Sequence, residues 1–183
     1  MPYLALVFLQ ELGLFFYLRQ FPSASTGIVY NIYSPVTLLI FGYIYYRLPF
    51  NTRLNKLIVI LAAVYMLVVL VSYNFLTSIF VLNSRLSVLA GFFITCYGIL
   101  FLLNYFGLDN SGEEKFWRPL LIMTIGIVIF YPVIGISFAF HKQLLAYEAT
   151  FYGLKLYQII PQVMSIFLYG SFSYTFYLCK KIS

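Results

Sequence analysis

The feature that most restricts the fold of this chain is a series of long apolar runs with almost no charge. Between Lys56 and Arg85, for example, the sequence carries no charged residue. Hydrophobic residues make up 63% of the chain and charged residues 9%, whereas soluble domains average about 25% charged residues. A single small water-soluble core cannot bury that much apolar surface. We therefore expect lipid to solvate most of the chain.

Six of the apolar runs are long enough to cross a membrane. A helix needs about 20 mainly apolar residues to cross the hydrocarbon core, and only helices or closed barrels satisfy their backbone there. The runs are continuous and do not alternate with period two, which excludes barrel strands. We predict an all-α polytopic transmembrane bundle that forms one domain, residues 1–183. Its six helices are expected at about residues 2–18, 28–47, 56–74, 86–107, 119–140 and 156–178.

The connections between these segments are short. Pro119 suits the first turn of the fifth helix, because a proline at that position loses no helical hydrogen bond. The stretch 75–84 is too apolar for a free loop, so we expect it at the membrane interface.

The distribution of cations predicts the orientation. One side carries Arg47, Arg53, Lys56, Lys115, Arg118, Lys180 and Lys181, and the other carries Arg19, Arg85, Lys142 and Lys155. The more basic side faces the cytoplasm by the positive-inside rule. We therefore expect a multi-pass protein of the cytoplasmic (inner) membrane with both termini in the cytoplasm.

Polar residues inside the predicted membrane segments are the first candidates for a functional site. Glu11 is the clear ionisable case, and ionisable groups within a membrane are costly. In the second segment Asn31, Ser34 and Thr37 recur every three residues and stay near one helical face. Together with Glu11 and with Gln162 of the last segment, these three residues form a candidate polar cavity. The alternative for each residue is a structural hydrogen bond to a neighbouring helix.

Small residues in the fourth segment predict a close helix contact. Ser87, Gly91 and Thr95 recur every four residues, and Gly98 lies near the same face. Such a stripe lets another helix approach closely, which matters where lipid supplies no hydrophobic drive. The sequence leaves open whether it is a packing surface within the chain or an interface with a partner.

Two prolines inside predicted helices are candidate hinges. Pro132 lies in the fifth segment and Pro161 in the sixth, and a proline inside a helix removes a backbone donor and favours a kink.

Motifs of enzymes and metal sites are missing from the sequence. It has one His and two Cys, and it lacks the G-x-S-x-G, H-E-x-x-H and P-loop patterns. We therefore expect no catalytic residue, no metal and no cofactor. The basic residues are scattered in ones and twos, so a nucleic-acid partner is not expected either. The expected partners are the lipid bilayer and another membrane protein or a second copy of this chain.

Four stretches of the chain carry a resemblance to a known group. Residues 11–18, 28–46, 97–106 and 113–132 are together similar to small, uncharacterised multi-pass proteins of bacteria. Some of those proteins resemble the membrane-embedded input regions of sensor kinases. The resemblance implies a helical module that works through a partner.

Two functions from different classes are compatible with these residues. The first is a non-enzymatic membrane module, either a sensory element or a subunit of a membrane complex. The alternative is a small transporter or channel with Glu11 as its intramembrane polar site.

Overall fold

A computed structural model of the chain contains six long α-helices. The structure describes residues 2–21, 27–48, 52–81, 83–107, 114–140, 143–144, 147, 150–151 and 154–182. The helices are α1 (Pro2–Gln20), α2 (Gly27–Tyr46), α3 (Thr52–Val71), α4 (Ser84–Gly107), α5 (Glu114–Ala139) and α7 (Leu156–Ile182). The π-helical turn η1 (Ser72–Leu76) extends α3. Between α5 and α7, β1 (Thr150–Phe151) and β2 (Leu154–Lys155) form a short antiparallel pair. The predicted all-α class and the six long helices are confirmed, and that all six cross the membrane stays a prediction.

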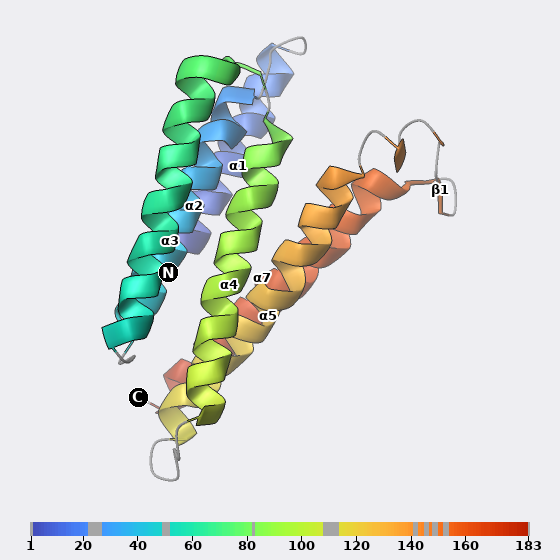
Figure 1. Cartoon of the computed structure of the whole chain (residues 1–183). Helices are drawn as coiled ribbons and strands as arrows, with labels where there is room; N and C mark the ends of the chain where they lie inside the picture. The colour runs from blue at the N-terminus through green and yellow to red at the C-terminus, as the bar shows by residue number, and fades with distance from the viewer. Residues whose placement is uncertain are drawn as a thin grey trace.

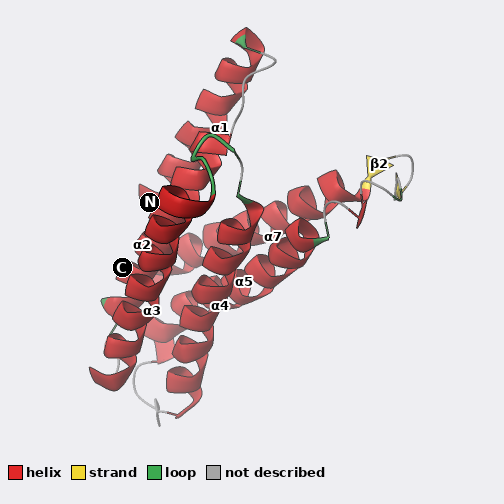
Figure 2. Cartoon of the chain, turned by 45° about the horizontal axis from the view of Figure 1, so that its top comes forward, coloured by secondary structure: helices red, strands yellow, loops and turns green. Residues whose placement is uncertain are grey.

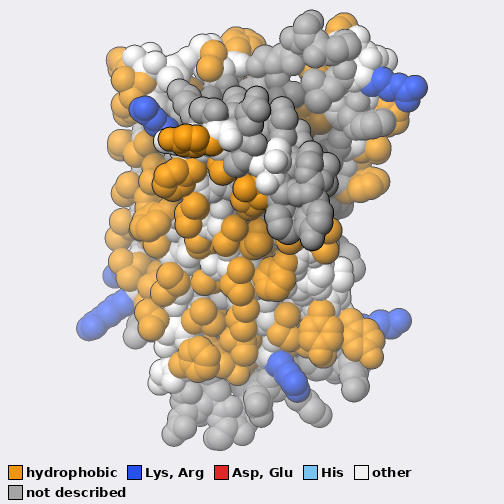
Figure 3. Space-filling view, turned by 90° about the vertical axis from the view of Figure 1, so that its right-hand side faces the viewer, with side chains coloured by type: hydrophobic (Ala, Val, Ile, Leu, Met, Phe, Trp, Pro, Cys, Tyr) orange, Lys and Arg blue, Asp and Glu red, His pale blue; other side chains and the backbone are white. Residues whose placement is uncertain are grey.

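Four of the helical segments are long and apolar enough to cross a membrane. They are Gly27–Tyr46, Thr52–Leu76, Ser84–Gly107 and Trp117–Ala139. Figure 3 shows apolar side chains over the middle of one face of the molecule, with Lys and Arg side chains toward its two ends. The protein is therefore a multi-pass membrane protein. The helices α1 and α7 are not among these four spans, because polar residues interrupt their apolar runs.

The predicted boundaries are correct to within a few residues, except at the start of α5. Pro119 was expected in the first turn, but α5 begins at Glu114, so this expectation is wrong. Trp117 explains the early start, because its side chain is buried and packs against Phe101 of α4 with ring centroids 6.1 Å apart. The carbonyl of Pro119 accepts a hydrogen bond of 3.1 Å from the Thr175 hydroxyl of α7.

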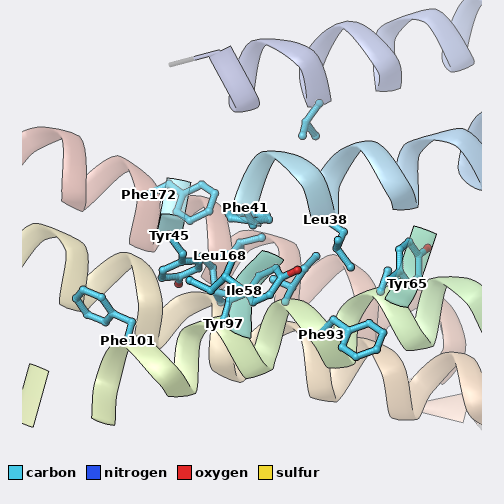
Figure 4. Packing of buried hydrophobic residues seen from close by; sticks show 14 of the residues in the cluster. Leu38, Phe41, Tyr45, Ile58, Tyr65, Phe93, Tyr97, Phe101, Leu168 and Phe172 are labelled. Carbon is cyan, nitrogen blue, oxygen red and sulfur yellow. The ribbon is translucent and has the colours of Figure 1, made fainter. Parts of the chain in front are cut away.

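Helix α4 lies at the centre of the bundle. It packs against α2, α3 and α5, and α5 packs in turn against α7 (Figure 1). One cluster of buried residues has members from all six helices. Figure 4 shows its aromatic part. The largest fully buried side chains include Tyr45, Tyr65, Tyr97, Phe41 and Phe101.

Helix α1 lies at the edge of the bundle and projects beyond it (Figures 1 and 2). Val7 and Leu14, seven positions apart, are its buried hydrophobic residues among those whose side chains are described. Phe8, Leu9 and Phe16 are exposed. Among the described side chains of α1, the side opposite Val7 and Leu14 is therefore exposed.

Candidate functional site

Asn31 is the centre of a polar cluster at one end of the bundle. Its side chain is 2% exposed. The amide nitrogen donates to the carbonyls of Ile79 at 2.7 Å and Val81 at 2.8 Å. The amide oxygen accepts from the N–H of Asn83 at 3.0 Å. Since both ends of the amide are bonded, Asn31 fixes the connection 77–83 to α2.

Asn83 continues this cluster into α4. It stands just before the first residue of α4, and its side-chain oxygen accepts from the N–H of Leu86 at 3.4 Å. That is the geometry of an N-cap, which satisfies a backbone donor of the first turn. The side-chain nitrogen of Asn83 donates to the Thr77 hydroxyl at 3.2 Å. Asn83 thus joins the connection to the start of α4.

Ser34 links the polar face of α2 to the small-residue stripe of α4. Its hydroxyl lies 2.9 Å from that of Ser87, close enough for a hydrogen bond in either direction. The Ser34 hydroxyl also lies 3.1 Å from the carbonyl of Tyr30, to which it can donate. Asn31 and Ser34 therefore both bond to protein groups outside α2. For Asn31 and Ser34, this arrangement favours structural hydrogen bonds to neighbouring elements over the lining of a polar cavity.

The other members of the predicted polar cavity are placed differently. Thr37 is buried, and its hydroxyl has no hydrogen-bond partner among the described residues. Gln162 is exposed on α7. Glu11 belongs to α1, but its side chain lies outside the described residues. The structure thus brings Asn31 and Ser34 into one cluster and leaves the exposed Gln162 out of it.

The small-residue stripe of α4 packs inside this chain. A Cβ atom at Gly91 would lie 3.3 Å from Tyr131 of α5, and one at Gly98 would lie 2.5 Å from Val128. The Thr95 hydroxyl bonds back to the carbonyl of Gly91 at 2.8 Å. These contacts favour a packing surface within the chain, and an interface with a partner stays the alternative. The neighbours of the stripe are α5 at the two glycines and α2 at its Ser87 end.

Tyr45 and Thr124 form a buried contact that the sequence analysis missed. The Tyr45 hydroxyl donates to that of Thr124 at 3.1 Å, and neither residue is exposed. Two signals in the sequence point to this pair. Leu38, Phe41 and Tyr45 follow helical spacing and are all buried, and Thr124 is the one hydroxyl in the apolar run 119–130.

The two candidate hinges lie inside continuous helices. α5 runs through Pro132 and α7 runs through Pro161. Pro132 is exposed and Pro161 is half-buried. Their role as hinges stays a prediction.

The described residues offer little for bond-making chemistry. Among them, no group of three or more His, Cys, Asp or Glu residues is placed to hold a metal ion. The polar contacts above join amides, hydroxyls and backbone groups, and their geometry is that of structural support. Comparisons with protein-family models, with curated proteins and with solved structures find no match to this chain. The similarity to membrane input regions of sensor kinases stays a prediction.

Proposed function

We propose that this protein is a non-enzymatic membrane module, a sensory element or a complex subunit, that acts through a partner bound at α1. The observation that carries the proposal is the outer face of α1, which the other helices of the chain leave uncovered. In this proposal α1 and α7 also cross the membrane, so that the bundle has six spans.

The outer face of α1 has the shape of a helix-packing surface. Leu9, Gly13 and Phe16 are four and three positions apart, so they lie on one side of the helix, and all three are exposed. A Cβ atom at Gly13 would meet no described atom within 4 Å. A glycine between two large apolar residues permits close approach of a second helix.

A protein partner fits α1 better than lipid alone. The half-buried Gln10 interrupts the apolar run of α1, and α1 is not among the four strongly apolar spans. A polar group at such a position is costly in lipid, and a neighbouring helix can supply hydrogen bonds to it. Leu67 and Leu70 of α3 are exposed too. Residues 57–64 of that helix include no polar residue, so α3 suits contact with lipid instead.

The described cations support the proposed orientation. Exposed side chains of Arg47, Arg53, Lys56, Arg118 and Lys180 lie at the end of the bundle where α2, α4 and α7 finish and α3 and α5 begin. Arg19 and Arg85 are the exposed cations described at the opposite end. This asymmetry favours a cytoplasmic location for both termini.

Purification from the native membrane in a gentle detergent tests the proposal. We expect a partner to co-elute in constant ratio and to be identified by mass spectrometry. Gly13→Leu should abolish that co-elution, because the new side chain fills the packing surface without disturbing the bundle. Gly170→Leu is the matched control, since a Cβ atom at Gly170 also meets open space. Absence of a stoichiometric partner, or its retention by the Gly13→Leu protein, would contradict the proposal.

A small transporter is the second candidate, and Thr37 favours it. A buried hydroxyl without a partner is uncommon, and a bound water or polar solute would satisfy it. This candidate predicts a pH-dependent flux in liposomes that Glu11→Gln alters and Thr37→Val lowers. Unchanged flux in both variants would count against it.

A further inference from the structure

We propose that residues 75–81 are embedded in the lipid interface and that Asn31 holds them there. The segment would form a membrane-anchored cap at the end of the bundle opposite the C-terminus. The apolar surface of this segment contacts lipid at the boundary between acyl chains and headgroups. This inference is independent of the partner proposed for α1.

The outer surface of the segment is strongly apolar. Phe75 is 81% exposed, Leu76 74%, Phe80 64% and Val81 63%. No charged residue occurs between Lys56 and Arg85 to hold this surface in water. Transfer of a large apolar side chain out of water is favourable, so exposure of all four to solvent is unfavourable. Lipid contact removes that cost.

The carbonyl groups near the end of the segment accept hydrogen bonds from the protein. Those of Ile79 and Val81 accept both hydrogens of the Asn31 amide. A backbone carbonyl without a partner is expensive in a low-dielectric environment, so an embedded connection needs such donors from the protein. A loop in water does not need them, because the solvent supplies hydrogen bonds. The buried amide of Asn31 therefore fits an embedded location.

The amide groups of the segment are also bonded internally. The N–H of Thr77 donates to the carbonyl of Ser72 at 2.9 Å, the closure of the π-helical turn. The N–H of Val81 donates to the carbonyl of Ser78 at 3.1 Å, and the N–H of Phe80 lies 3.3 Å from the Ser78 hydroxyl. These three N–H groups are thus paired within the protein.

The length of α3 places the segment at the correct depth. About 20 residues cross the hydrocarbon core, so a span that starts after Lys56 reaches the far boundary near Leu76. The apolar surface of the segment continues that of α3, where Leu67 and Leu70 are exposed. Arg85 follows the segment and is exposed, as suits a cation at headgroup level.

The connection at the other end of α3 has the opposite character. Arg47 lies just after α2, and its Nε donates to the Tyr43 hydroxyl at 3.0 Å. Arg53 and Lys56 follow on the first turn of α3, and all of these side chains are exposed. Thr52, exposed at the start of α3, therefore marks the aqueous boundary and provides a control position.

Tryptophan fluorescence in lipid vesicles tests the proposal. Trp117 is the one tryptophan of the chain, and it is buried. The emission of an introduced second tryptophan is therefore obtained by subtracting the emission of the native protein from that of the variant. We would compare Phe80→Trp with Thr52→Trp in phosphatidylcholine vesicles. The quenchers are lipids brominated near the headgroup and iodide in the aqueous phase. We expect the bromolipid to remove most of the added emission of Phe80→Trp, and iodide to quench Thr52→Trp more strongly.

Asn31→Leu in the Phe80→Trp background tests the role of the amide. The substitution leaves two carbonyls without donors, and we expect the segment to move toward water, with red-shifted emission and stronger iodide quenching. Should the double variant not fold, the comparison of Phe80 with Thr52 still decides the location. Iodide quenching of Phe80→Trp equal to that of Thr52→Trp overturns the proposal. So does protection from both quenchers, which would mean that a protein surface covers the segment.

Discussion

Two parts of this molecule, the packing of α4 on α5 and of α5 on α7 and the contact of α1 with the bundle, are built in different ways. In the first, glycines let the helices approach closely. A Cβ atom at Gly98 would lie 2.5 Å from Val128, and one at Gly126 would lie 2.8 Å from Ser171. The Thr175 hydroxyl of α7 adds a hydrogen bond to the carbonyl of Pro119 in α5, and Tyr45 of α2 donates to Thr124 of α5. In the second, α1 buries Val7 and Leu14, and most of the other large residues of α1 whose side chains are described are exposed.

The difference shows what specifies a fold inside lipid. Apolar side chains gain little by leaving lipid for another helix, so close packing and hydrogen bonds between helices decide which faces meet. α4, α5 and α7 have both of these features. α1 has open space beside Gly13, and it has apolar side chains, such as Phe8 and Leu9, that are exposed. The first contact therefore determines the bundle, and the second leaves the surface of α1 on which the proposed partner would bind.

Among the substitutions that distinguish these two parts of the molecule, Gly98→Ala is expected to change the free energy of unfolding most. The added methyl group collides with Val128, a β-branched residue with few alternative rotamers, so α5 must shift. Overpacking of this kind costs about 1–3 kcal/mol. The free energy of unfolding in a mixed-micelle SDS titration measures the loss.

Gly170→Ala is the control for this substitution. A Cβ atom there meets no described atom within 4 Å, and alanine in place of a helical glycine stabilises by about 0.5–1 kcal/mol. The two variants should therefore change stability in opposite directions. Equal stability of the native and Gly98→Ala proteins would show that the α4–α5 contact is looser than the structure has it.

Leu38→Ala and Leu14→Ala are expected to differ in their loss of stability, by less than Gly98→Ala and Gly170→Ala differ. Leu38 is fully buried on α2, whereas Leu14 is buried on the weakly covered α1. In lipid the truncation loses packing but little transfer energy, so we expect about 1–2 kcal/mol for Leu38→Ala, below the 2–5 kcal/mol of soluble cores. Leu14→Ala should cost less than half of that in the same titration. Equal costs would place α1 in the core.

Much of the fold could be predicted from the sequence, because its signals are local. Runs such as 57–71 fix a helix and its length through lipid, and the stripe from Ser87 to Gly98 marks a packing face. The partner of that stripe could not be predicted. Which helix meets Gly98 depends on the shapes of Val128 and Thr124 together, and those residues are far from it in the sequence.

The role of Asn31 could be predicted only in part. Its position within an apolar segment indicates a polar partner, and the interfacial location of 75–84 was expected from composition. The link between the two was not, because Asn31 bonds to backbone carbonyls of Ile79 and Val81. A carbonyl has no residue-specific signature, so nothing in the sequence names these positions as acceptors.

The smallest effect is expected from a pair of tyrosines in the core. Tyr45 and Tyr97 are both fully buried with ring centroids 6.3 Å apart, but only the Tyr45 hydroxyl has a hydrogen-bond partner among the described residues. Removal of a hydrogen bond between membrane helices costs about 0.6 kcal/mol on average, which is the loss we expect for Tyr45→Phe. Tyr97→Phe removes a hydroxyl that gains nothing from the protein, so stability should stay unchanged or rise slightly.

Unfolding titrations of both proteins, repeated enough to resolve a few tenths of a kcal/mol, test this pair. A Thr124→Val variant provides the matched control for Tyr45, because the double variant should cost no more than either single one. If Tyr97→Phe lost as much stability as Tyr45→Phe, the Tyr97 hydroxyl would have to hold a bound water inside the bundle. That result would favour the transporter candidate, since the hydroxyls of Thr37 and Tyr73 are also buried without a partner among the described residues and would need a polar solute as well.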